Sequence, residues 1–133
     1  MNALIEKITE KDPRYAAEAY RFVRDALEYT VSRLDAPRHV SGQELLEGIR
    51  EYALEQFGPI ARRVLEEWGI RTCLDFGHIV FNMVEAGLLA KREEDSLEDF
   101  RGGYDFEEAF VKPFLPRSLR EKTTIRLPEE GKR

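Results

Sequence analysis

TCLDFGHIVFNMVEAGLLAKREEDSLEDFRGGYDFEEAF, residues 72–110, is the stretch of the sequence that decides the fold. In its first half, apolar residues recur at steps of three and four, a spacing that places them on one face of a helix. These residues are Phe76, Ile79, Val80, Met83, Val84 and Gly87. Thr72 can cap the start of this helix, and Asp75 can return a hydrogen bond to the cap. The pattern predicts an amphipathic helix that begins at residue 72 and ends near Gly87.

The second half of the stretch loses the helical period after residue 89 and becomes rich in charged residues. The adjacent glycines at 102 and 103 favour a tight turn, because glycine adopts positive φ without steric cost. We predict a β-hairpin or extended wing with arms at residues 88–91 and 104–111, and one helical turn over residues 96–100. The apolar residues of the second arm do not alternate cleanly, so a short helix that begins at Asp105 is the alternative.

Two helices are predicted in the first third of the chain. Residues 2–11 have apolar side chains at helical spacing and predict a short helix or a docking arm. Asp12 and Pro13 form a start signal, since aspartate caps helices and proline fits the first helical position. The apolar period that follows predicts a long amphipathic helix over residues 15–34.

Two more helices are predicted before the deciding stretch. Ser41 and Glu44 have the spacing of a capping box and open a helix that Gly58 ends. Pro59 then starts a shorter helix, and Gly69 ends it in the same way. The residues of this shorter helix that we expect to point inward are Ile60, Val64, Leu65 and Trp68.

This order of elements predicts a mainly α (α+β) fold. Three helices in quick succession followed by a hairpin are the order of a winged helix-turn-helix, here with extra N-terminal helices, and this is an analogy at the level of the fold. With 133 residues, of which 42% are apolar, the chain is long enough for one ordinary core. We predict a single α-rich globular domain over residues 1–115 and a basic, proline-containing, flexible tail over residues 116–133.

Composition points to a reducing compartment. The single cysteine, Cys73, cannot form an internal disulfide, so the chain is not a disulfide-rich secreted scaffold. No stretch approaches the roughly 18 apolar residues that a membrane-spanning helix needs. We therefore expect a cytoplasmic protein without a membrane partner. Cys73 lies at a predicted helix start, where thiols are often activated, but a small buried core residue is the favoured interpretation.

The distribution of charge argues against nucleic acid as a partner. Residues 92–111 carry eight acidic and two basic side chains, and the predicted helix at 72–87 contains no lysine or arginine. Because phosphate contacts provide most of the affinity for DNA, such a surface repels it. A DNA-binding transcriptional regulator of the winged-helix type remains an alternative, through this helix and the basic end of the chain. The basic residues concerned are Lys112, Arg117, Arg120, Lys122 and Arg126.

A polar stripe is predicted on the outer face of the 72–87 helix. Steps of three, four and three residues bring its members to one side of the helix. The stripe consists of Asp75, His78, Asn82 and Glu85. A carboxylate and an imidazole at this spacing could share a metal, so a metal-dependent or noncanonical enzyme that uses Asp75, His78 and Glu85 is a further alternative. A solvated polar face is favoured, since the chain contains no catalytic motif, and we expect no cofactor and no enzyme activity.

Aromatic residues are interleaved with the acidic ones after residue 92. Apolar anchors surrounded by charge are typical of protein interfaces. The candidate contact residues are Phe100, Tyr104, Phe106 and Phe110. The sequence thus favours a noncatalytic protein-interaction or regulatory module, whose partner is another protein or a second copy of the chain.

Several short sequence segments together resemble a small uncharacterised bacterial family found mainly in planctomycete and verrucomicrobial genomes. They are DPRY at 12–15, AYRFV at 19–23, HVSGQELLEGIREYA at 39–53, DFGHIVFNMVEAGLL at 75–89 and GGYDFEEAF at 102–110. The resemblance implies a bacterial, cytoplasmic origin and a match over the whole domain. It implies no activity, ligand or site residue.

Overall fold

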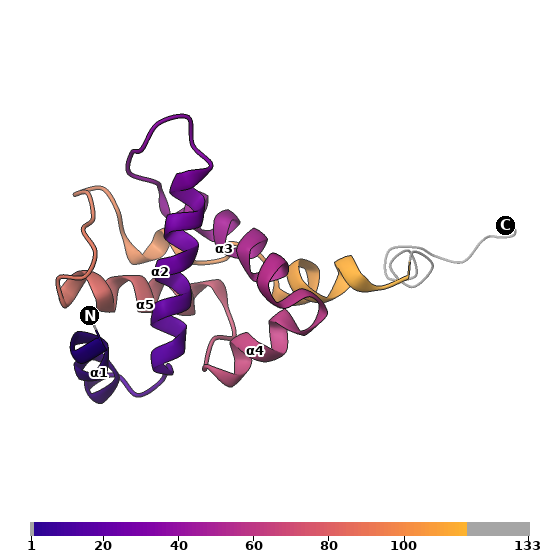
Figure 1. Ribbon diagram of the computed structural model, residues 1–133, viewed down its shortest axis with the longest axis horizontal. Helices are drawn as coiled ribbons and strands as arrows, with labels where there is room; N and C mark the ends of the chain where they lie inside the picture. Colours follow the sequence, from indigo (N-terminus) through magenta and orange to yellow (C-terminus); the bar gives the residue numbers. More distant parts are fainter. Residues whose placement is uncertain (1, 117–133) are drawn as a thin grey trace, which may run out of the picture.

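The computed structural model describes residues 2–116 as a helical domain, so the predicted mainly α class is confirmed (Figure 1). The α-helices are α1 (Asn2–Lys11), α2 (Ala17–Ser32), α3 (Gly42–Phe57), α4 (Ala61–Glu67) and α5 (Cys73–Glu85). Four short helical turns accompany them, namely η1 (Gly58–Ile60), η2 (Leu97–Phe100), η3 (Glu107–Val111) and η4 (Lys112–Phe114). The predicted flexible tail lies, from residue 117 onward, outside the described residues.

The core is built where α2 crosses α3 and α5, as Figure 1 shows. α2 meets α3 closely because Gly48 has no side chain. A Cβ built on Gly48 would lie 1.8 Å from Oγ1 of Thr30 in α2. Thr30 is itself buried, and its hydroxyl donates to the carbonyl of Ala26 at 2.7 Å. α2 and α3 therefore cross where Gly48 faces Thr30, whose hydroxyl already has its hydrogen-bond partner.

The predicted helix ends are confirmed for α3 and α4. Ser41 and Glu44 form the capping box, in which the Glu44 amide donates to Ser41 Oγ at 3.1 Å and the Ser41 amide donates to Glu44 Oε1 at 2.8 Å. Gly58 ends α3 with a φ of 57°. Gly69, after α4, has a φ of 93°, and a Cβ there would lie 2.1 Å from the carbonyl oxygen of Arg14. Positive φ and this close approach both require glycine.

The predicted start of the second helix is wrong. α2 begins at Ala17, after an N-cap residue, Ala16, whose side chain makes no cap hydrogen bond. Asp12 serves another purpose, because its carboxylate accepts hydrogen bonds from the backbone amide of Arg14 at 3.2 Å and from its guanidinium at 2.8 Å. Asp12 thus shapes the turn between α1 and α2 instead of capping α2.

The predicted β-hairpin or wing is also wrong, since residues 2–116 contain no strand. The segment from residue 88 to residue 96 is a loop, and the helical turn expected after it is present as η2. The alternative, a short helix from Asp105, is correct: the Ala109 amide donates to the Asp105 carbonyl at 2.9 Å, and η3 follows. The helices therefore do not carry the wing of a winged helix-turn-helix.

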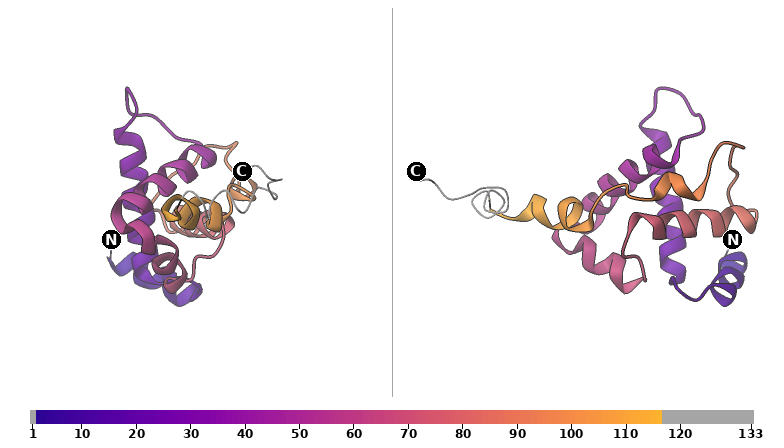
Figure 2. Two further views of the ribbon diagram at one scale, coloured as in Figure 1. Left: turned by 90° about the vertical axis from the view of Figure 1, so that its right-hand side faces the viewer. Right: turned by 180° about the vertical axis from the view of Figure 1, so that it is seen from behind.

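The physical reason is packing. Figure 2 shows the segment 97–114 running along one side of the helices, and η2 and η3 contact α3, with η2 also on α5 and η3 also on α4. Three of its aromatic rings are buried against these helices, with Phe100 and Phe106 3% exposed and Phe110 0% exposed. In a strand, Tyr104, Phe106 and Phe110 would share one face and Ala109 would point to the other, whereas the helical turn buries Phe106, Ala109 and Phe110 together. Burial of several aromatic rings outweighs local propensity.

Two smaller findings concern single residues and helix length. Ile60 was expected to point inward, but it lies in η1 and is 52% exposed, while Leu65 of α4 is fully buried as predicted. Within residues 2–116, no helix combines the length and the apolar character that crossing a membrane requires.

Candidate functional site

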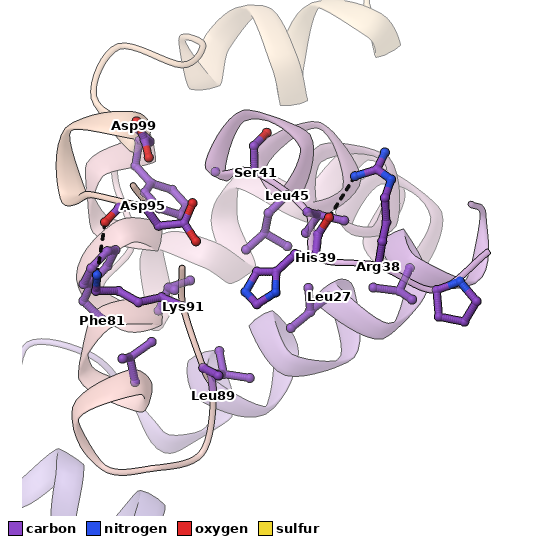
Figure 3. Close-up of a pocket in the computed structure, with 18 residues that line it drawn as sticks. Leu27, Arg38, His39, Ser41, Leu45, Phe81, Leu89, Lys91, Asp95 and Asp99 are labelled. Atoms are coloured by element: carbon purple, nitrogen blue, oxygen red, sulfur yellow. Dashed lines mark hydrogen bonds between the residues drawn. The ribbon is translucent and has the colours of Figure 1, made fainter. Parts of the chain in front are cut away.

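A groove of about 530 Å³ opens between the end of α2, the start of α3 and the second half of α5 (Figure 3). The loops at residues 37–41 and 89–99 form its two rims. Its apolar lining consists mainly of Leu27, Val31, Val40, Leu45, Val80, Phe81, Val84 and Leu89. Most of these side chains are half-buried, so they remain accessible to a bound molecule. We call this feature the apolar groove.

Local sequence explains why this part of the surface is left open. α2 ends at Ser32, and Pro37 in the turn that follows prevents the chain from resuming the helix. Gly87, with a φ of 84°, ends the helical path after α5 and directs the chain into the second rim. Apolar side chains at the end of α2 and in the second half of α5, such as Val31 and Val84, are therefore only partly covered by the rest of the domain.

The end wall of the groove is η2, which two glycines hold close. A Cβ on Gly77 of α5 would lie 2.9 Å from the Phe100 side chain, and a Cβ on Gly42 of α3 would lie 2.9 Å from the Asp99 side chain. Phe100 is 3% exposed and packs edge-on against Phe81, with ring centroids 6.5 Å apart. The wall is therefore tightly fitted.

The first rim carries Arg38 and His39. The guanidinium of Arg38 donates to both carboxylate oxygens of Glu44, at 3.1 and 2.9 Å, and to the carbonyl of His39 at 2.8 Å. The hydrogen bonds from Arg38 lower the pKa of Glu44 to about 2. This rim is electrically balanced, because its arginine is already paired within the chain.

The second rim carries Lys91, Asp95 and Asp99. Asp95 accepts a hydrogen bond from the Arg92 amide at 2.9 Å, and its carbonyl accepts one from Lys91 Nζ at 3.4 Å. The Ser96 amide donates to Asp99 Oδ2 at 3.0 Å, which closes the cap of η2. Figure 3 shows this rim facing Arg38 and His39 across the groove. Hydrogen bonds within the loop hold the shape of the rim.

Three of the four aromatic residues predicted as partner contacts are instead core residues. Phe100, Phe106 and Phe110 are between 0% and 3% exposed. Tyr104 is half-buried, and its hydroxyl donates to the Leu46 carbonyl at 2.8 Å. Burial raises the pKa of Tyr104 above its usual range. Of the four residues, Phe100 alone lines the apolar groove.

The predicted polar stripe is divided between structural and exposed residues. Asp75 accepts hydrogen bonds from the Tyr15 hydroxyl at 2.6 Å and from the Thr72 amide at 3.1 Å, so it caps α5 and ties it to the chain before α2. Burial and the bond to Asp75 raise the pKa of Tyr15. Asp75 is therefore a structural residue.

Asn82 has a comparable role about two turns later in α5. Its amide nitrogen donates to Asp12 Oδ2 at 2.9 Å and to the Tyr20 hydroxyl at 3.0 Å. The hydrogen bonds from Arg14 hold the pKa of Asp12 below its usual range, with a smaller contribution from Asn82. These bonds join α5 to both α2 and the α1–α2 turn.

His78 is half-buried and Glu85 is exposed. Within residues 2–116, no three histidine, cysteine or acidic side chains are placed so that they could hold a metal ion. The structure thus does not bring Asp75, His78 and Glu85 together as a metal site. Glu85 and Asn82 instead line a second cavity of about 430 Å³ between α1 and α5, whose charged residues include Lys7 and Lys11 beside Asp12.

Cys73 is the small buried core residue that the sequence favoured, at 2% exposed. Its thiol lies 3.4 Å from the Tyr104 carbonyl, to which it donates, and burial raises its pKa to about 11.

The Cys73 thiol of the folded protein is expected to react with a neutral disulfide reagent at pH 8 about 100-fold more slowly than the thiol of the unfolded chain. The reason is that a pKa two units above the ordinary 9.0 reduces the thiolate fraction by about that factor. Absorbance kinetics with and without urea measure this. Equal rates would show that the thiol is accessible and ionisable.

Comparison of the chain with protein-family models, curated proteins and solved structures gives no match. The resemblance of its sequence segments between residues 12 and 110 to a bacterial family therefore stays a prediction.

Proposed function

We propose that this chain is a noncatalytic protein-interaction module that holds an apolar face of another protein in the groove between α2, α3 and α5. The observation that carries the proposal is the apolar groove itself. It has a volume of about 530 Å³ and a mainly apolar lining. Half-buried aliphatic side chains surrounded by charged rims are the arrangement that protein interfaces use.

The other predicted functions have less support. A DNA reader would need donors on the outer face of α5, yet Asp75 carries an acceptor carboxylate and the Asn82 amide already donates to Asp12 and Tyr20. The net charge of −6 over residues 92–111 opposes contact with phosphate. Of the basic residues considered for nucleic acid, Lys112 pairs with Glu108 at 2.6 Å, and the others lie outside the described residues.

A photo-crosslinking residue at position 89 tests the proposal, because Leu89 lines the groove and is half-buried. We expect it to form a covalent adduct with a protein in cells, whereas the same residue at the exposed position of Ile60 forms none. Val84→Asp is expected to reduce the yield at position 89 about tenfold or more, since a charge in an apolar site is costly.

Val64→Asp is the matched control, because Val64 is also a half-buried valine in a helix but lies outside the groove. Thermal unfolding of both variants checks that they are folded. Adducts that form equally at positions 60 and 89, or that survive Val84→Asp, would contradict the proposal.

A further inference from the structure

The two rims of the apolar groove differ in charge. The second rim, residues 89–99, contains five acidic residues against Lys91 and Arg92, so its net charge is −3, and Glu98 is paired with Arg101 at 2.8 Å. On the opposite rim, Arg38 is neutralised by Glu44 and the exposed His39 is the remaining titratable group. Figure 3 shows Asp95 and Asp99 on one side of the groove and Arg38 and His39 on the other. The groove is thus apolar in the middle and acidic along one edge.

Within residues 2–116, the negative charge of this edge is only partly offset. Arg92 is shared between Glu94 at 3.5 Å and Asp95 at 3.8 Å. Lys91 directs its ammonium to backbone carbonyls of Arg92 and Asp95. Glu93 is exposed between these residues. At physiological salt the Debye length is about 8 Å, so charges closer than this to a bound molecule still attract or repel it.

Apolar side chains on the floor of the groove repeat every four residues along two helices. Leu27 and Val31 form a row of residues four apart on α2, and Val80 and Val84 form such a row on α5. A row of side chains on a bound helix can pack into the space between rows of this kind. An amphipathic helix laid into an apolar groove by residues three and four apart is also an established mode of peptide recognition.

Building on the proposed function, we propose that the partner presents a basic amphipathic helix. Its apolar stripe occupies the groove, and its lysine or arginine residues lie along the edge that faces residues 92–99. Opposite charge at this edge favours such a helix and disfavours an acidic one of the same apolar content.

The test uses the full chain and three labelled helical peptides with the same leucine stripe, whose flanking positions are all Lys, all Gln or all Glu. Fluorescence anisotropy measures binding at low and high salt. We expect the Lys peptide to bind about tenfold tighter than the Glu peptide at about 50 mM salt, and the ratio to fall towards one at high salt, because screening removes the contribution of exposed charges.

Two charge-reversal variants locate the effect. Glu93→Lys combined with Glu94→Lys, both at exposed positions of the second rim, should weaken the Lys peptide and strengthen the Glu peptide by at least about threefold each. Glu6→Lys combined with Glu10→Lys makes the same change in net charge on α1, which contributes no lining residue to the groove within residues 2–116. This control should leave the ratio of the two affinities nearly unchanged.

Each result has a definite meaning. If the Glu peptide binds as tightly as the Lys peptide, or if the α1 control acts like the rim variant, the basic-helix inference is overturned. The proposed function survives that outcome when Val84→Asp weakens every peptide. If no peptide binds in a manner that depends on Val84, the helix inference fails, and the crosslink from position 89 decides the proposed function independently.

Discussion

Replacing Phe106 with alanine is expected to destabilise the fold by about 3–5 kcal/mol, the usual cost of removing a buried aromatic ring. Phe106 is 3% exposed and sits at the centre of an aromatic cluster. Its ring lies 5.0 Å from Phe110 in an edge-on arrangement, 5.9 Å from Phe76 and 6.2 Å from Tyr104. The variant therefore loses both apolar burial and several ring contacts. Urea unfolding followed by circular dichroism measures the change in the free energy of unfolding.

Phe114→Ala is the matched control for this experiment. Phe114 is an aromatic residue of the same C-terminal segment but is 44% exposed, so its loss should change stability by no more than about 0.5 kcal/mol. A result in which Phe106→Ala unfolds at the same urea concentration as the wild type would contradict the buried position of the ring. It would return Phe106 to the surface, where the sequence had suggested a partner contact.

Gly48→Ala is expected to destabilise the protein by about 2 kcal/mol or more, although alanine in the middle of a helix normally stabilises it by about 1 kcal/mol. The reason is the contact with α2, since the new methyl group would lie 1.8 Å from Thr30 Oγ1 and 2.9 Å from its Cβ. The two helices must separate to relieve the overlap. The same urea experiment measures the effect, and Gln43→Ala, at an exposed position of α3, serves as the control.

A double variant separates this clash from a general effect of the substitution. Thr30→Ala removes the hydroxyl and the methyl group that oppose position 48, at the expense of the hydrogen bond to Ala26. In the double variant, the two substitutions should be less destabilising together than the sum of the single ones by at least about 1 kcal/mol, because contacting residues couple. Additive effects would mean that the clash is relieved elsewhere.

The features that depend on neighbouring residues were predictable from the sequence. The capping box of Ser41 and Glu44, the stop at Gly58 and the period of the α5 helix need only a few residues each, and the structure contains all of them. Asp12 shows the limit of such local rules. It had the residue type and position of a helix cap, but the competing contacts with Arg14 and Asn82 hold it in a turn instead.

The features that depend on tertiary packing were not predictable in this way. In residues 88–111, adjacent glycines and aromatic residues are compatible with a hairpin and with helical turns, and burial against α3 and α5 decides between them. The apolar groove is formed by side chains from segments 27–45 and 80–100, which only the fold brings together. The one signal for it in the sequence was the acidic excess after residue 92, which marks one edge.

The late position of the covering segment has a consequence for the growing polypeptide. The segment 97–114 follows α2 to α5 in the chain, so these helices leave the ribosome before it does, at a synthesis rate of about 5–20 residues per second. Until then, Phe76 and Cys73 lack the rings and backbone that later cover them. A released chain that ends before residue 97 thus exposes the apolar surface around Phe76 and Cys73, and we expect chaperones to bind it there.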